Sequence, residues 1–119
     1  MDGTNQASLL GVTDTHLSLI GTKHSGSVNV GLNKDGTMRL YKGDSTSLEI
    51  AITGGSIVSL DITTGSTFDS LTLNGTAVAG AGASKTFSVN VGGTSAVLSN
   101  PGSSAQSWIA KIVIHYTLS

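Results

Sequence analysis

Cysteine is absent from this chain of 119 residues, and proline occurs once. Without cysteine, neither a disulfide framework nor a thiolate zinc site can form. A chain of this length buries enough surface to fold without either staple. Because secreted eukaryotic domains often carry disulfides, their absence favours a bacterial source or a reducing compartment.

Charge is also sparse: six Lys and Arg residues stand against seven Asp and Glu, for a net charge of −1. Nucleic acids require a basic face and anionic membranes attract polybasic segments, so we expect neither partner. No apolar run approaches the ~20 residues of a membrane-spanning helix, so we expect no membrane insertion.

Residues 1–10 lack the basic start and apolar stretch of a signal peptide. We expect a single domain over residues 1–119, linked to other domains in a longer chain.

The residues that are present favour β structure. There are 16 glycines and many Ser and Thr, whereas strong helix formers are scarce. No stretch of helical length has a 3.6-residue apolar period, but short alternating runs recur between Gly, Asn, Asp and Ser clusters. This pattern predicts an all-β fold: a two-sheet antiparallel β-sandwich, jelly-roll-like, with nine or ten short strands.

The expected strands cover residues 16–20, 27–32, 37–42, 47–53, 56–63, 71–73, 76–79, 86–91, 96–99 and 107–118. Tight turns at Asp35-Gly36, Gly54-Gly55 and Asn74-Gly75 predict three hairpins, of which 47–63 has the clearest pattern. The last strand, being long, is expected inside a sheet with partners on both sides. Residues 1–15 have the weakest pattern and are expected to be a linker or an edge strand.

Apolar positions of the alternating runs define the expected core. They are Leu48, Ile50, Ile52, Val58, Leu60, Ile62, Phe87, Val89, Ile112, Ile114 and Tyr116.

Residues 27–118 resemble the small accessory β-sandwich modules of large secreted or surface proteins of Firmicutes, Tenericutes and Bacteroidetes. The resemblance rests on four strings. They are Arg39-Leu40-Tyr41 before a polar turn, the Ile- and Val-rich pair 48–52 and 57–62, the turn Leu73-Asn74-Gly75-Thr76, and the closing strand Ile109-Ala110-Lys111-Ile112-Val113-Ile114-His115-Tyr116. Trp108 stands where such modules commonly have Arg, and Phe87 where they often have Trp. The resemblance implies a non-catalytic accessory role, secreted or at the cell surface, and transfers no binding residues.

The sequence offers little for catalysis. There is no Gly-x-Ser-x-Gly elbow, and the three histidines lie far apart in the chain. Glu49 and Asp61 fall on the same face of the expected 47–63 hairpin, where they could form a carboxylate pair, although a solvated sheet face explains them better. We therefore expect no enzymatic activity and no catalytic residues.

A structural calcium ion is the one cofactor that the residues suggest. Asn33 and Asp35, with the carbonyl of Thr37, have a spacing compatible with oxygen ligation, as does the polar loop at Asp44-Ser45-Thr46. An ordinary Asp-Gly hairpin turn accounts for the first group equally well.

Sugar binding on β-sandwiches usually relies on aromatic faces, and only 4% of this chain is aromatic. Trp108 and Tyr41 are the rings that the alternation does not assign to the core, so we predict a ligand site at Trp108, Tyr41, Arg39 and Lys42. In the alternative, Trp108 caps one end of the core.

Three functions follow from these features. The first is carbohydrate binding or adhesion, with a glycan or cell-surface polymer as the partner. The second is a structural spacer or interaction domain without a small ligand. The third is a phage or filament structural subunit.

Overall fold

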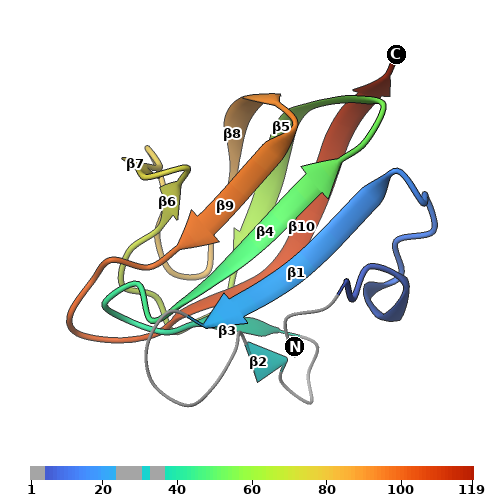
Figure 1. Cartoon of the computed structure of the whole chain (residues 1–119). Helices are drawn as coiled ribbons and strands as arrows, with labels where there is room; N and C mark the ends of the chain where they lie inside the picture. The colour runs from blue at the N-terminus through green and yellow to red at the C-terminus, as the bar shows by residue number, and fades with distance from the viewer. Residues whose placement is uncertain (1–4, 24–30, 33–36) are drawn as a thin grey trace.

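The computed structural model describes residues 5–23, 31–32 and 37–119, which contain ten strands in two five-stranded antiparallel sheets (Figure 1). In spatial order, the first sheet consists of β1 (Leu17–Lys23), β4 (Thr46–Ile52), β9 (Ser95–Ser99), β6 (Thr72–Leu73) and β7 (Thr76–Ala77). The second consists of β2 (Gly31–Leu32), β3 (Met38–Leu40), β10 (Ser107–Leu118), β5 (Gly55–Thr64) and β8 (Thr86–Gly93). The predicted two-sheet β-sandwich is confirmed.

The chain changes sheet at most of its connections, so most consecutive strands face each other across the core. Among the described strands, β2–β3 and β6–β7 are the consecutive pairs that hydrogen-bond as hairpins. The prediction of a 47–63 hairpin is wrong: β4 and β5 belong to different sheets. A strand that crosses to the other sheet also points alternate residues inward, so local sequence cannot separate the two cases. Gly55 permits the close pairing of β5 with β10 within the second sheet, because a Cβ there would lie 2.1 Å from the carbonyl oxygen of Thr117 on β10.

Both sheets contribute apolar side chains to one core. Its buried hydrophobic residues are Ala7, Leu17, Leu19, Met38, Leu40, Leu48, Ile50, Ile52, Ile57, Leu60, Ile62, Leu71, Leu73, Ala96, Leu98 and Ile109. Five of the predicted core residues are in this set. Five more are half-buried and pack against it: Phe87, Val89, Ile112, Ile114 and Tyr116.

Val58 is the predicted core residue that the structure places elsewhere, with 48% of its surface exposed. The register of β5 shifts between Ile57 and Ser59 against both of its neighbours. This bulge inserts one residue, so Ile57 takes the inward position that alternation gave to Val58. A second register shift in β10, between Ile109 and Lys111, lets Ile109 and Ile112 both face the core.

Residues 5–16, called the N-terminal segment below, run beside the edge of β1 (Figure 1). They form a short 3-10 helix, Ser8–Leu10, and one bridge from Asn5 to Ile20. Ala7 is buried, and Leu10 and Val12 pack against the core. Within the described residues, no helix is long and apolar enough to cross a membrane.

Candidate functional site

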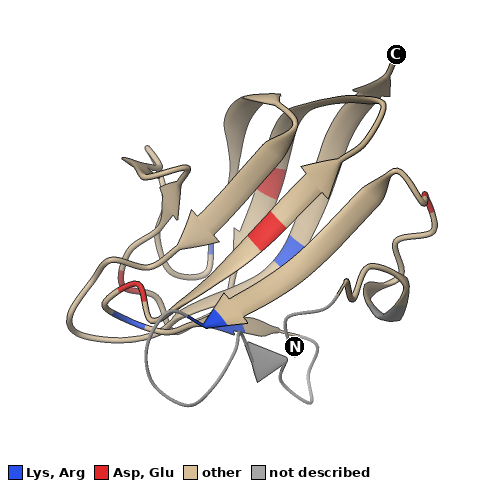
Figure 2. Cartoon of the chain, viewed as in Figure 1, with Lys and Arg blue, Asp and Glu red and all other residues tan. Residues whose placement is uncertain are grey.

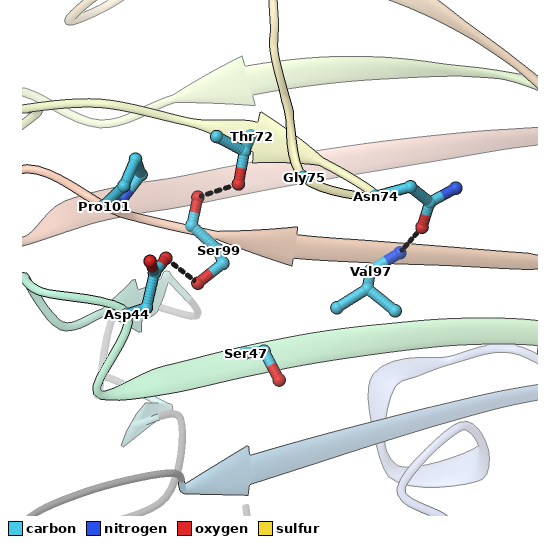
Figure 3. Close-up of a pocket in the computed structure, with 8 residues that line it drawn as sticks. All are labelled: Asp44, Ser47, Thr72, Asn74, Gly75, Val97, Ser99 and Pro101. Carbon is cyan, nitrogen blue, oxygen red and sulfur yellow. Dashed lines mark hydrogen bonds between the residues drawn. The ribbon is translucent and has the colours of Figure 1, made fainter.

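A groove of about 520 Å³ lies on the outer face of the first sheet (Figure 3). This volume falls within the range of small-molecule sites in proteins. Strands β4, β6 and β9, the β6–β7 turn and two loops contribute its lining residues, which are Asp44, Ser47, Thr72, Asn74, Gly75, Val97, Ser99 and Pro101.

Strand register explains why hydroxyl groups gather here. Ser47 on β4 is directly opposite Ser99 on β9, and Ser99 is directly opposite Thr72 on β6. On β1, Thr22 is opposite Ser47 and continues the row. The residues before and after each of the three groove members point inward, so Ser47, Ser99 and Thr72 all lie on the outer side of the sheet; Ser47 is nonetheless buried there, whereas Ser99 and Thr72 are half-buried. The result is a line of hydroxyl side chains that crosses four strands.

Asp44 forms one wall of the groove. Its φ of 54° lies in the left-handed region, which Asp and Asn tolerate better than other residues with a Cβ. The loop is held by backbone hydrogen bonds from Asp44 N to Asn100 O (2.8 Å) and from Gly43 N to Gly102 O (2.7 Å). Ser99 Oγ donates to Asp44 Oδ1 at 2.6 Å, which directs the carboxylate toward the row of hydroxyls.

The β6–β7 turn forms the opposite wall. Both of its central residues have positive φ, 50° for Asn74 and 83° for Gly75, as a type I′ turn requires. Asn74 Oδ1 accepts a hydrogen bond from Val97 N at 2.8 Å, and Asn74 Nδ2 donates to Ser95 O at 3.2 Å. The turn is therefore fastened to β9 by a side chain as well as by strand pairing.

Pro101 closes the groove at the start of the β9–β10 loop, and two buried or half-buried polar residues hold that loop. Asn100 is fully buried; its Nδ2 donates to Ala105 O at 2.8 Å and its Oδ1 accepts from Gly102 N at 3.0 Å. Asp69 Oδ2 accepts from the backbone N–H groups of Ser104 and Ala105. These two bonds lower the pKa of the Asp69 carboxyl, since they favour its charged form.

Charge is scarce throughout the molecule, and Asp44 provides the one charged side chain among the lining residues (Figure 2). Its second carboxylate oxygen has no protein partner in the described part of the chain. Ser99 Oγ donates to Asp44 and Thr72 Oγ1 donates to Ser99 O at 3.4 Å, so these two hydroxyl oxygens can still accept from a ligand. The groove thus offers one anionic acceptor, two hydroxyl acceptors, and apolar surface from Val97 and Pro101. Such a set suits a neutral ligand with several hydroxyl groups.

The predicted ligand residues lie on the other sheet. Register places Arg39 of β3 opposite Trp108 of β10, and the guanidinium lies 5.2 Å from the ring centroid. Trp108 is half-buried and its Nε1–H donates to Gln106 Oε1 at 2.8 Å. One ring face is therefore covered by a cation, and the polar edge is bonded within the protein.

The other two predicted residues, Tyr41 and Lys42, follow β3 in the loop that leads to Asp44. Tyr41 is half-buried and Lys42 is exposed. The structure thus joins Arg39 to Trp108 as a pair, and brings none of the four predicted residues into the groove lining. Sequence reasoning missed the groove because residues of three strands, one turn and two loops build it, although it had identified the Asn74-Gly75 turn and the polar loop at Asp44.

Glu49 and Asp61 do not form the carboxylate pair that a 47–63 hairpin would give. They point outward from different sheets, so the core separates them. Asp61 instead accepts from Ser88 Oγ at 2.6 Å and contacts His115 Nε2 at 2.7 Å. These two contacts, Ser88 first, lower the pKa of Asp61. Because Ser88 donates to the carboxylate and not to an imidazole base, the trio lacks the order that activates a nucleophile.

The proposed calcium ligands Asn33 and Asp35 lie outside the described residues. Among the residues that the structure does describe, no three His, Cys, Asp or Glu side chains gather as a metal site would require. Comparison of the chain with known protein families, curated proteins and solved structures finds no match.

Proposed function

We propose that this protein is a non-catalytic module that binds glycans, and that the groove on the first sheet is its binding site. The observation that carries the proposal is the row of outward hydroxyls from Ser99 and Thr72, bounded by the Asp44 carboxylate. Sugar hydroxyl groups present donors at short spacing, which such a set of acceptors can match. The sparse charge favours a neutral polymer over a charged one. A bacterial secreted or surface protein, as the resemblance implies, would use such a module for adhesion.

Trp108 and Tyr41 are weaker candidates for the contact, because none of the five aromatic side chains is exposed. Without a stacked ring, the affinity should lie near the millimolar range, worth about 4 kcal/mol. Useful attachment then requires several copies or a linked partner domain.

The test is a glycan array followed by titration of any ligand found, with the wild type and three variants. Asp44→Asn keeps the side-chain size and the tolerated backbone conformation while removing the charge. It should weaken binding about tenfold or more, because hydrogen bonds to a charged group contribute about 1.5–3 kcal/mol. Thr72→Val removes one hydroxyl at nearly constant shape and should weaken binding less.

Trp108→Phe serves as the matched control on the second sheet. It should bind as well as the wild type if the groove is the site. Loss of binding in Trp108→Phe together with full binding in Asp44→Asn would move the site to Arg39 and Trp108. An array without any ligand would support the second candidate function, a structural spacer or interaction domain, which the half-buried aromatic rings favour.

A further inference from the structure

Within the residues that the structure describes, strand β10 is unpaired along most of one edge. On one side it pairs with β5 from Ile109 to Leu118. On the other side β3 pairs with Ser107–Ile109 and then ends. The strand therefore lies inside the sheet with a partner on each side, as expected, but residues 110–118 are unpaired on the β3 side and form an open edge there within the described part of the structure.

Among the described residues, no backbone hydrogen bond reaches this edge. Ser119 N donates to Gly54 O, which lies on the β5 side. Successive residues of an antiparallel strand direct their backbone groups to opposite sides, so counting back from Ser119 places those of Tyr116, Ile114 and Ile112 at the open edge. The register shift near Ser59 leaves this count unchanged, because the extra residue belongs to β5.

Apolar surface accompanies the open edge. Two hollows of about 220 and 310 Å³ lie between β10 and the N-terminal segment, and Val12, Ile112 and Ile114 line both of them. The described large hydrophobic residues that are exposed are Val58, Val113 and Leu118, which all belong to β5 and β10. Exposed hydrophobic residues beside an unpaired strand edge are typical of surfaces to which another strand adds.

We propose that β10 pairs with β10 of a second copy of this chain, antiparallel and about a two-fold axis. The register that pairs all of residues 110–118 is centred on Ile114. It places Ile112 opposite the partner's Tyr116, an aromatic and β-branched pair, and Val113 opposite the partner's His115. Lys111, the one charged residue of the segment apart from its histidine, faces the partner's Thr117, so no like charges meet.

This pairing would form about six hydrogen bonds between the copies, because each of the three facing pairs at Ile112, Ile114 and Tyr116 exchanges two. It would also cover Val113 and bring apolar side chains toward the two hollows. Strand β8, at the other edge of the same sheet, is a weaker candidate. It carries no exposed large hydrophobic residue and ends in Gly92-Gly93. This inference does not depend on the proposed function.

Thr117 gives a sharp test, because its side chain is exposed and should face Lys111 of the second copy. Sedimentation equilibrium of the 119-residue chain should show a concentration-dependent dimer. Thr117→Lys opposes two lysines at both ends of the pairing and should raise the dimer Kd at least about tenfold. Thr117→Glu should lower the Kd, and added salt should remove that gain. Combining Thr117→Lys with Lys111→Glu should restore the wild-type Kd.

Asn90→Lys on β8 is the matched control, since it adds the same charge at an exposed position on the opposite edge of the sheet. It should leave the dimer unchanged, and circular dichroism should show that every variant is folded. The proposal fails if the wild type is monomeric up to ~1 mM, where association is worth only about 4 kcal/mol. It also fails if Thr117→Lys dimerises like the wild type, or if Asn90→Lys dissociates the dimer.

Discussion

Tyr116 Oη donates a 2.5 Å hydrogen bond to Asp14 Oδ2, across 102 positions of sequence. The bond joins the last strand to the N-terminal segment beside the open edge of the sandwich. Asp14 also bonds, through Oδ1, to the backbone N–H and the ring Nδ1 of His16. The Tyr116 hydroxyl and then the contacts with His16 lower the pKa of Asp14 from 3.8 to about 2.

This shift predicts a specific response to acid. A carboxyl whose pKa is lower in the folded state stabilises the fold above its unfolded value, and the contribution is lost as the pH falls toward the folded value. For Asp14, the loss should occur between pH 3.8 and about 2. Tyr116→Phe should lower the free energy of unfolding at neutral pH, and the difference from the wild type should shrink over that interval.

Urea unfolding at several pH values measures both effects. Tyr41→Phe is the control, because it removes a hydroxyl from another half-buried tyrosine that does not contact Asp14. Its difference from the wild type should stay constant over the same interval. A pH-independent difference for Tyr116→Phe would show that the hydroxyl does not act through the Asp14 charge.

Substitutions of Ile50 and Val58 test the core prediction, which was confirmed for Ile50 and wrong for Val58. Ile50 is fully buried in β4, so Ile50→Ala should cost about 2–5 kcal/mol of unfolding free energy. Val58 stands on the bulge and is half-exposed, so Val58→Ala should change stability by about 0.5 kcal/mol or less. Chemical denaturation measures both. Equal losses would mean that alternation, and not the bulge, describes the side-chain positions of β5.

The fold was more predictable from the sequence than its details. Every described β-strand overlaps a predicted one, because alternation and turn residues are patterns that extend over only a few neighbouring positions of the sequence. The Asn74-Gly75 turn was predicted for the same reason. A bulge such as that at Val58 depends on how two neighbouring strands align, and the sheet to which β5 belongs depends on the whole topology. Local sequence contains neither.

The groove was beyond sequence reasoning for a related reason. Ser47, Ser99 and Thr72 are common residues at unremarkable positions, and their value arises when register aligns them. The prediction chose aromatic residues instead, because sugar sites on β-sandwiches usually rely on aromatic faces. All five aromatic residues are half-buried in the structure.

Asn100 should be important for the fold and for the groove. It is fully buried, and Asn100→Ala would leave the carbonyls of Leu40 and Ala105 without their side-chain donor. The expected cost is about 1–3 kcal/mol. Because the next residue, Pro101, lines the groove, ligand affinity should fall as well. A thermal melt and a titration measure the two effects, and an unchanged melting temperature would contradict the role assigned to this side chain.

We expect no turnover of glycans, esters or nucleic acids by the wild type. Glu49 and Asp61 lie on opposite outer faces and cannot act on one substrate. Assays with the wild type and with the Glu49→Gln, Asp61→Asn double variant should therefore both show background rates. An activity that is present in the wild type and lost in the double variant would contradict the proposal of a non-catalytic module.

Gly75 and Gly93 allow a test of how strictly the groove depends on its turn. Neither glycine has an atom within 4 Å of the position where a Cβ would be, but Gly75 has a φ of 83°, whereas Gly93 is not in the left-handed region. Gly75→Ala should therefore cost roughly 1–2 kcal/mol, since a Cβ is disfavoured in that conformation. Gly93→Ala should be neutral or stabilise by about 0.4–1 kcal/mol through a less flexible unfolded chain.

If the groove binds a glycan, only the Gly75 variant should also lose affinity, because Gly75 lines the groove and Gly93 does not. Equal stability of the two variants in denaturant titrations would show that the turn relaxes without cost.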